Sequence, residues 1–128
     1  MTDPADMQVQ LKTLSDAYAV QLPEKFKLIK QAWCHLSRHE WSEDGFQDLC
    51  RMVHSMTGSG KMFGFSLLSD VARNLEAYLN QLAQVKTPPN DEQRQCIQSL
   101  LDELHQATTI RDAISIATAL GAGLPSSG

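Results

Sequence analysis

The residues best suited to chemistry in this 128-residue chain surround one histidine, His54. Gly58 and Ser59 follow it by about one helical turn, and Gly64 stands ten residues after it. A neutral imidazole is a nucleophile, and small residues beside it would leave a flat surface that another protein could approach. Glycine inside a helix costs about 1 kcal/mol relative to alanine, so Gly58 and Gly60 favour a packing or docking role. The pattern predicts a histidine that hands a chemical group to a partner.

Helical spacing predicts which neighbours share the exposed surface with the histidine. Phe46, Val53 and Gly60 centre the apolar stripe of one predicted helix, and His54 falls on the neighbouring stripe at the solvent boundary. We expect a partner to contact a surface centred on His54 and Gly58, in which apolar atoms supply area and polar atoms set orientation. The other expected members of this surface are Gln47, Arg51, Met56, Thr57, Lys61 and Phe65.

Two other groups of residues could suggest a metal or a disulfide. The cysteines lie far apart with no Cys-x-x-Cys spacing, which argues against a disulfide framework and a zinc knuckle. His35 and His39 are four residues apart and could share a metal with Cys34. No Glu directly follows His35, and both histidines project away from the apolar stripe. We therefore predict no metal site, and keep a metal-binding helical bundle as the most distant alternative.

The segment Thr-Gly-Ser-Gly-Lys, residues 57–61, resembles part of a phosphate-binding loop. Such a loop needs a Ser or Thr after the Lys, an earlier Gly at a fixed spacing and a preceding strand. None of these features is present around Lys61. We predict that the chain has no nucleotide site or kinase activity of its own.

Composition limits the remaining classes of function. The chain has a formal net charge of −4, with its basic residues scattered, which argues against a nucleic-acid surface. No apolar run approaches the roughly 18 residues of a membrane span, and the acidic N-terminus does not resemble a signal peptide. We expect a cytoplasmic protein that binds neither nucleic acid nor membrane.

Periodicity predicts an all-helical fold, with breakers between the helices. We expect an antiparallel four-helix bundle with an additional N-terminal helix. Pro23 is expected to separate the N-terminal helix, residues 1–22, from the bundle, residues 23–120, and residues 121–128 are expected to form a flexible tail.

Local signals predict where the helices begin and end. Ser42 is a plausible N-cap, Gly64 allows a tight turn, and a turn ending in Asn90 supplies another capping residue. Thr109 with Asp112 could cap a short separate helix ending near Leu120, or the last helix could continue with a bend. The sequence leaves both arrangements open.

The region around His54 resembles the histidine-containing phosphotransfer (HPt) domains of multistep two-component phosphorelays. Those domains have the pattern His-x-Leu-Lys/Arg-Gly-Ser/Ala-Ser/Ala, a second Gly ten residues after the His, and then Leu-Ser-x-x-Ala-x-x-Leu-Glu. Two residues depart from it, since Met56 replaces the Leu and Thr57 replaces the Lys or Arg. The matching residues are His54, Gly58, Ser59, Gly64, Leu68, Ser69, Ala72, Leu75 and Glu76.

This resemblance implies a phosphoryl carrier rather than an enzyme. His54 would become phosphohistidine and carry the group between aspartates of receiver domains in hybrid sensor kinases and response regulators. The receiver would supply Mg²⁺, so no intrinsic cofactor is expected, and we expect a monomer. Because Thr57 is uncharged, the candidates to stabilise the phosphoryl charge are Lys61, which could reach back toward it along the same stripe, and Arg51, one turn before the histidine. The alternative is a helical adaptor that binds a receiver and inhibits signalling without transfer.

Overall fold

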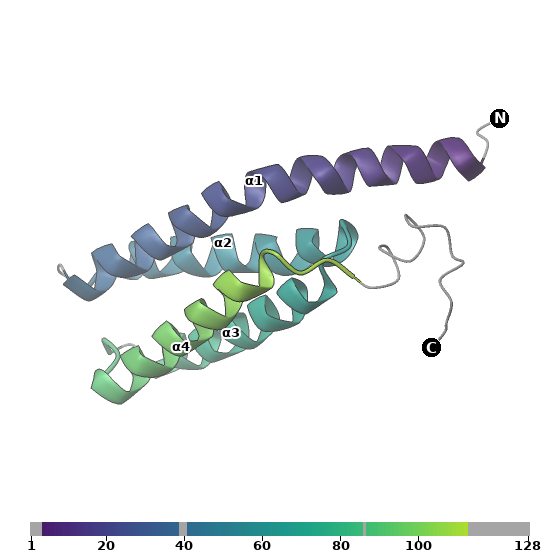
Figure 1. Ribbon diagram of the computed structural model, residues 1–128. Coiled ribbons are helices and arrows are strands. Elements are labelled where there is room, and N and C mark those ends of the chain that lie inside the picture. The colour runs from purple at the N-terminus through teal and green to yellow at the C-terminus, as the bar shows by residue number, and fades with distance from the viewer. Residues whose placement is uncertain (1–3, 39–40, 86, 113–128) are drawn as a thin grey trace.

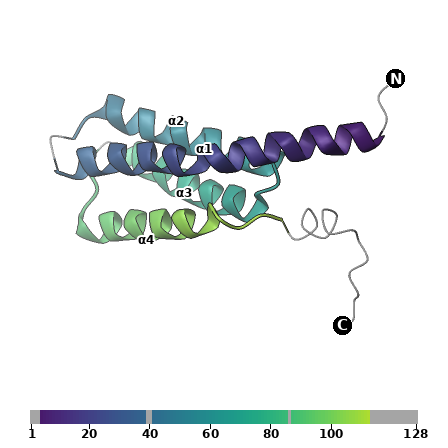
Figure 2. The same cartoon turned by 45° about the horizontal axis from the view of Figure 1, so that its top comes forward.

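The computed structural model describes residues 4–38, 41–85 and 87–112, and these form a bundle of helices (Figure 1). The helices are α1 (Pro4–Arg38), α2 (Glu43–Met62), α3 (Ser66–Val85) and α4 (Asp91–Ala107). Within the described ranges there is no strand. The all-helical prediction is thus confirmed. Successive helices run in opposite directions because short connections join them (Figure 2).

The additional N-terminal helix is not confirmed. α1 runs from Pro4 to Arg38 as one helix with Pro23 inside it, so the expected break at residue 22 is absent. Proline removes one helical hydrogen bond, but Leu22 and Phe26 on either side are both buried in the same core. Packing of one continuous apolar face therefore outweighs the local cost of the proline, whose own side chain is exposed.

The core lies where the four apolar stripes meet. Along α3, the side chains of Leu68, Leu75 and Leu79 are completely buried. Fully burying a leucine side chain contributes about 1.5–3 kcal/mol, which makes this stripe a large part of what holds the bundle together. Facing them are Leu22, Ile29, Trp33 and Leu36 of α1, Leu49 and Val53 of α2, and Ile97, Leu101 and Leu104 of α4.

The predicted caps of α2 and α4 are confirmed. The Ser42 hydroxyl accepts a hydrogen bond from the Gly45 backbone N–H at 3.2 Å. Asn90 accepts from the backbone N–H of Gln93 at 2.8 Å, and the Gln93 side chain accepts from the backbone N–H of Asn90 at 2.9 Å. These bonds satisfy donors that a helix N-terminus otherwise leaves unpaired.

Asp112 caps a helix that lies far from it in sequence. Its carboxylate accepts from the backbone N–H of Ser66 at 2.7 Å and from the Ser66 hydroxyl at 2.8 Å. Gly64, with a φ of 89°, makes the preceding turn, and its carbonyl accepts from the Asp112 N–H at 2.8 Å. α4 ends at Ala107, and residues 108–112 that follow it are not helical. The helix considered up to Leu120 and the expected tail, residues 121–128, lie outside the described residues.

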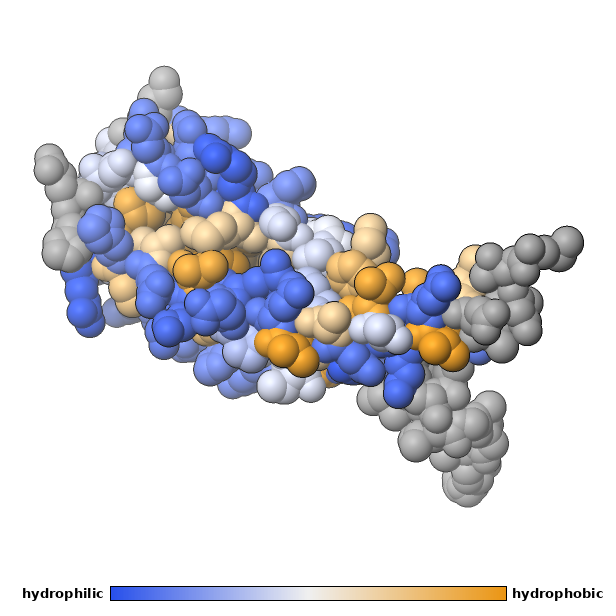
Figure 3. All heavy atoms as spheres, turned by 90° about the horizontal axis from the view of Figure 1, so that it is seen from above, coloured by the Kyte–Doolittle hydropathy of each residue, from blue (hydrophilic) through white to orange (hydrophobic). Residues whose placement is uncertain are grey.

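The first part of α1 extends beyond the other helices (Figures 1 and 2). Met7, Leu11 and Leu14 are about half exposed there, at 55%, 54% and 51%. Seen from above, hydrophobic side chains show at the surface of this N-terminal half (Figure 3). Among the described helices, none is both long enough and apolar enough to cross a membrane.

Candidate functional site

His54 projects from the outer side of α2. Its side chain is 75% exposed, whereas Val53 and Met56 on the inner side of the same helix are buried at 0% and 2%. The buried residues fix the rotation of α2 about its axis. An exposed imidazole on a helix held in this way is accessible to a partner protein.

Glu76 of α3 holds one nitrogen of this imidazole. His54 Nδ1 forms a hydrogen bond with Glu76 Oε2, and the Glu76 side chain is only 19% exposed. An ionised carboxylate can only accept, so Nδ1 carries the proton and the lone pair of the neutral ring lies on Nε2. The pair therefore selects which nitrogen can act as a nucleophile.

A shallow hollow between α2 and α3 adjoins His54. Burial raises the pKa of the Cys50 thiol, and the negative charge of nearby Glu76 raises it further. Cys50 is thus a neutral, half-buried thiol in the wall of the hollow. The lining consists of Phe46, Gln47, Cys50, Arg51, His54, Glu76, Asn80 and Ala83.

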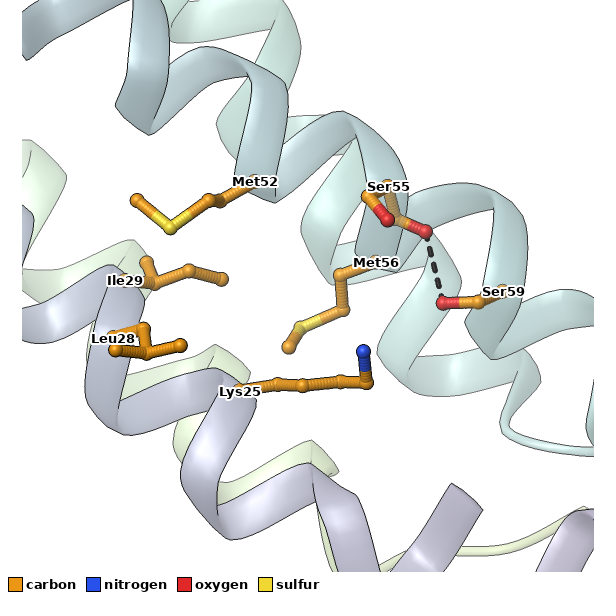
Figure 4. A pocket seen from close by; sticks show the side chains of 7 residues that line it. All are labelled: Lys25, Leu28, Ile29, Met52, Ser55, Met56 and Ser59. Carbon is orange, nitrogen blue, oxygen red and sulfur yellow. Dashed lines mark hydrogen bonds between the residues drawn. The ribbon is translucent and has the colours of Figure 1, made fainter. Parts of the chain in front are cut away.

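A second hollow lies between α1 and α2 (Figure 4). Lys25 extends from α1 across it toward Ser59, whose hydroxyl donates to the Ser55 carbonyl at 2.8 Å. Because that proton is engaged, Tyr18 must donate its hydroxyl to Ser59 Oγ, at 2.7 Å. Apolar side chains complete the lining, namely Leu28, Ile29, Met52 and Met56.

Most residues predicted to surround His54 lie at the surface. Gln47, Arg51, Gly58 and Lys61 are exposed, and Thr57 is half-buried. A Cβ atom added to Gly58 would meet nothing within 4 Å. Two of these residues are already engaged. The Thr57 hydroxyl donates to the Val53 carbonyl at 3.1 Å, and Arg51 pairs with Asp48 at 3.4 Å.

Met56 and Phe65 are not on the exposed rim, which corrects the prediction for both. Met56 lies three residues after Val53 on the inner side of α2 and is 2% exposed. Phe65 is 1% exposed beneath the α2–α3 turn, where its ring centroid lies 5.7 Å from that of Tyr18. Both are core residues, so neither can contact a partner.

The metal alternative gains no support from the part of the chain that the structure describes. There, no three His, Cys, Asp or Glu side chains lie together as a metal site would require. His39 lies outside the described residues, while Cys34, like Cys50 and Cys96, is a half-buried free thiol.

A comparison with known protein families shows to which family this chain belongs. The family model of the Hpt domain matches residues 8–107, from the first part of α1 to the end of α4. The chain belongs to the Hpt domain family. Hpt domains are phosphocarrier modules of phosphorelays that interact with receiver domains. Comparisons with curated proteins and with solved structures gave no match.

Proposed function

We propose that this Hpt domain carries a phosphoryl group on His54 between aspartates of receiver domains, in hybrid sensor kinases and response regulators of the cytoplasm. The observation that supports the proposal most directly is the geometry of the imidazole. Its ring is 75% exposed, and Glu76 engages Nδ1, which leaves the nucleophilic Nε2 for the incoming phosphorus.

Transfer is an in-line displacement at phosphorus. The Nε2 lone pair of His54 attacks the phosphorus of a receiver aspartyl phosphate, and the N–P bond forms as the P–O bond to the aspartate breaks. The bonding electron pair leaves on the aspartate carboxylate. The ring gains positive charge, which Glu76 stabilises through Nδ1–H. A second receiver reverses the same step, and Mg²⁺ comes with the receiver, so the carrier itself needs only a positioned nucleophile.

The docking surface that we propose is centred on His54 and Gly58. Gly58 leaves open space one turn from the imidazole, where a larger side chain would hold a partner away. The surface excludes the buried Met56 and Phe65. Its rim comprises Gln47, Arg51, Thr57 and Lys61. A small, partly polar surface of this kind suits a transient complex of the monomeric carrier.

A transfer assay tests the proposal. The protein is incubated with a phosphorylated receiver domain and Mg²⁺, and the acid-labile phosphate is mapped by peptide mass spectrometry. We expect label on His54, and its loss in His54→Gln with helix content unchanged by circular dichroism. His35→Gln, which replaces another exposed histidine, is the matched control and should be labelled like the wild type.

Label that persists in His54→Gln, or maps elsewhere, contradicts the proposal. Binding without label by several receivers, equally strong in His54→Gln, would instead favour the inhibitory adaptor. The adaptor is considered because Thr57 lacks the positive charge that would favour transfer to the histidine.

A further inference from the structure

A phosphoryl group on His54 would bring two negative charges to an exposed site, and α2 offers it little positive charge. The residue three positions on is Thr57, whose hydroxyl is already bonded to a backbone carbonyl. Arg51 forms an exposed ion pair with Asp48 at 3.4 Å, which is shorter than the 3.9 Å pair that Arg73 of α3 forms with Asp70. Lys61 lies seven residues away, about 10 Å along the helix axis. The neighbouring helix is the other place to look for a cation.

One stripe of α3 faces α2 along its length. Residues 69, 73, 76 and 80 are spaced four, three and four apart, so they lie on one side of the helix. Ser69 donates its hydroxyl to the Thr57 carbonyl at 2.6 Å, and Glu76 accepts from His54. Asn80 lines the hollow that adjoins His54. Two members of the stripe thus bond to α2, and a third lines the hollow between the two helices.

Arg73 is the remaining member of this stripe, between Ser69 and Glu76. Because Ser69 reaches the Thr57 carbonyl and Glu76 reaches His54, Arg73 emerges beside the segment of α2 that joins Thr57 to the histidine. α3 therefore places a guanidinium next to the position where α2 has a threonine. Arg73 is far from Thr57 in sequence, and it is the register of α3 against α2 that brings the two residues together.

The Arg73 side chain is free to move toward a new anion. It is 57% exposed, and its ion pair with Asp70 is long, at 3.9 Å, between two exposed groups. Exposed pairs of this kind contribute only about 0–1 kcal/mol, so a nearby phosphoryl group can displace Asp70. A guanidinium also offers paired N–H donors that match two phosphoryl oxygens.

We propose that Arg73 binds the phosphoryl group on His54 and supplies the positive charge that Thr57 does not. This inference rests on the proposed function of His54. Arg73 stays protonated throughout and makes no covalent bond. Its guanidinium donates hydrogen bonds to the phosphoryl oxygens while Glu76 holds Nδ1 of the same ring. α3 then contributes both Glu76, which orients the imidazole, and Arg73, which stabilises the phosphoryl group on it.

The test uses phosphoramidate, a small phosphoryl donor that removes receiver docking from the measurement. The rate of phosphorylation at His54 is followed by mass spectrometry in the wild type, in Arg73→Gln and in the control Lys27→Gln. Lys27 is an exposed cation of α1 that lines neither hollow. We expect Arg73→Gln to be about five-fold slower, since a surface ion pair is worth at most about 1 kcal/mol, and Lys27→Gln to be unchanged.

Two further measurements separate charge from structure. High salt should shrink the difference between wild type and Arg73→Gln, because exposed charges are screened. The double variant Thr57→Arg with Arg73→Gln should recover the wild-type rate, because it restores a cation to the same place from the other helix. The rate at the exposed His35 in the same samples serves as an internal standard.

An unchanged rate in Arg73→Gln, or a loss that is independent of salt and not recovered by Thr57→Arg, overturns the role of Arg73. Such a result leaves the function of His54 standing if the wild type still takes label from a receiver. Absence of receiver-derived label on His54 in the wild type is the different outcome that defeats the proposed function itself.

Discussion

Two sides of α2 use the same residue type in opposite ways. On the outer side, a Cβ atom added to Gly58 would meet no heavy atom within 4 Å. On the side facing α3, a Cβ added to Gly60 would lie 3.4 Å from the Phe65 carbonyl oxygen and 3.4 Å from the Ser69 nitrogen. Gly60 therefore lets the start of α3 approach α2 closely, while Gly58 leaves space for a molecule outside the bundle.

A small residue near an exposed histidine therefore does not by itself indicate docking. Both glycines lower the stability of the helix. Only at Gly60, which is buried, does close packing against α3 offset that loss. At Gly58 no contact within the described structure offsets it. We therefore propose a docking role for Gly58 and not for Gly60.

The largest expected effect is on the side of α2 that faces α3. Phe65→Ala should lower the free energy of unfolding by about 3–5 kcal/mol, because it empties a fully enclosed site beneath the turn. Urea denaturation followed by circular dichroism measures the loss. Leu67→Ala, two residues away and 45% exposed, is the control and should lose much less. Equal losses in both variants would show that Phe65 is not part of the core.

The variants Gly60→Leu and Gly58→Leu test whether the two glycines differ in their packing. Gly60→Leu should destabilise the fold by about 1–3 kcal/mol, since its side chain would meet the backbone at the start of α3. Gly58→Leu should leave stability unchanged or raise it by up to about 1 kcal/mol, because leucine is the better helix former. Urea denaturation of both variants gives the two values.

In phosphoryl transfer from a receiver, Gly58→Leu should be the variant with the large effect, although it has the smaller effect on stability. Gly58→Leu should slow it by about ten-fold or more, which corresponds to roughly 1.4 kcal/mol of lost contact energy. Phosphorylation of Gly58→Leu by phosphoramidate should stay normal, because the small donor needs no docking surface. Normal transfer from a receiver to Gly58→Leu would remove Gly58 from the docking surface that we propose.

Local patterns predicted much of the fold, because they depend on neighbours in sequence. The caps at Ser42 and Asn90 and the turn at Gly64 each follow from one residue and its conformational preference. The predicted helix break at Pro23 was wrong because it took only local sequence into account. A local rule for proline was outweighed by burial of the apolar stripe on both sides of it, which depends on tertiary packing.

The site depended more on contacts between helices, and the sequence alone predicted less of it. Glu76 was recognised only as part of a pattern, since its hydrogen bond to His54 depends on the register of α2 against α3. That register could have been sought by pairing residues on either side of the Gly64 turn. Met56 and Phe65 were assigned to the surface from their nearness in sequence, although one lies on the inner side of α2 and the other beneath the turn.

The smallest predicted effect concerns the chain after α4, which returns to the α2–α3 turn. Arg111 pairs with Asp16 of α1 at 2.7 Å and lies over the Phe65 ring, 5.6 Å from its centroid. The hydrogen bond from Arg111 lowers the pKa of Asp16 below its usual 3.8. A lowered folded-state pKa contributes stability above the unfolded-state value, and that stability is lost as the pH falls through the folded-state value.

Arg111→Gln should therefore be less stable than the wild type at neutral pH, and the difference should narrow on acidification below about pH 4. Urea denaturation at a series of pH values measures both quantities. A difference that persists in acid would belong to the contact between Arg111 and the Phe65 ring, which involves no titration of Asp16. A difference that does not change with pH at all would show that the ion pair between Arg111 and Asp16 contributes nothing to stability, and that the chain after α4 is held at the turn by the hydrogen bonds of Asp112 and by the contact with Phe65.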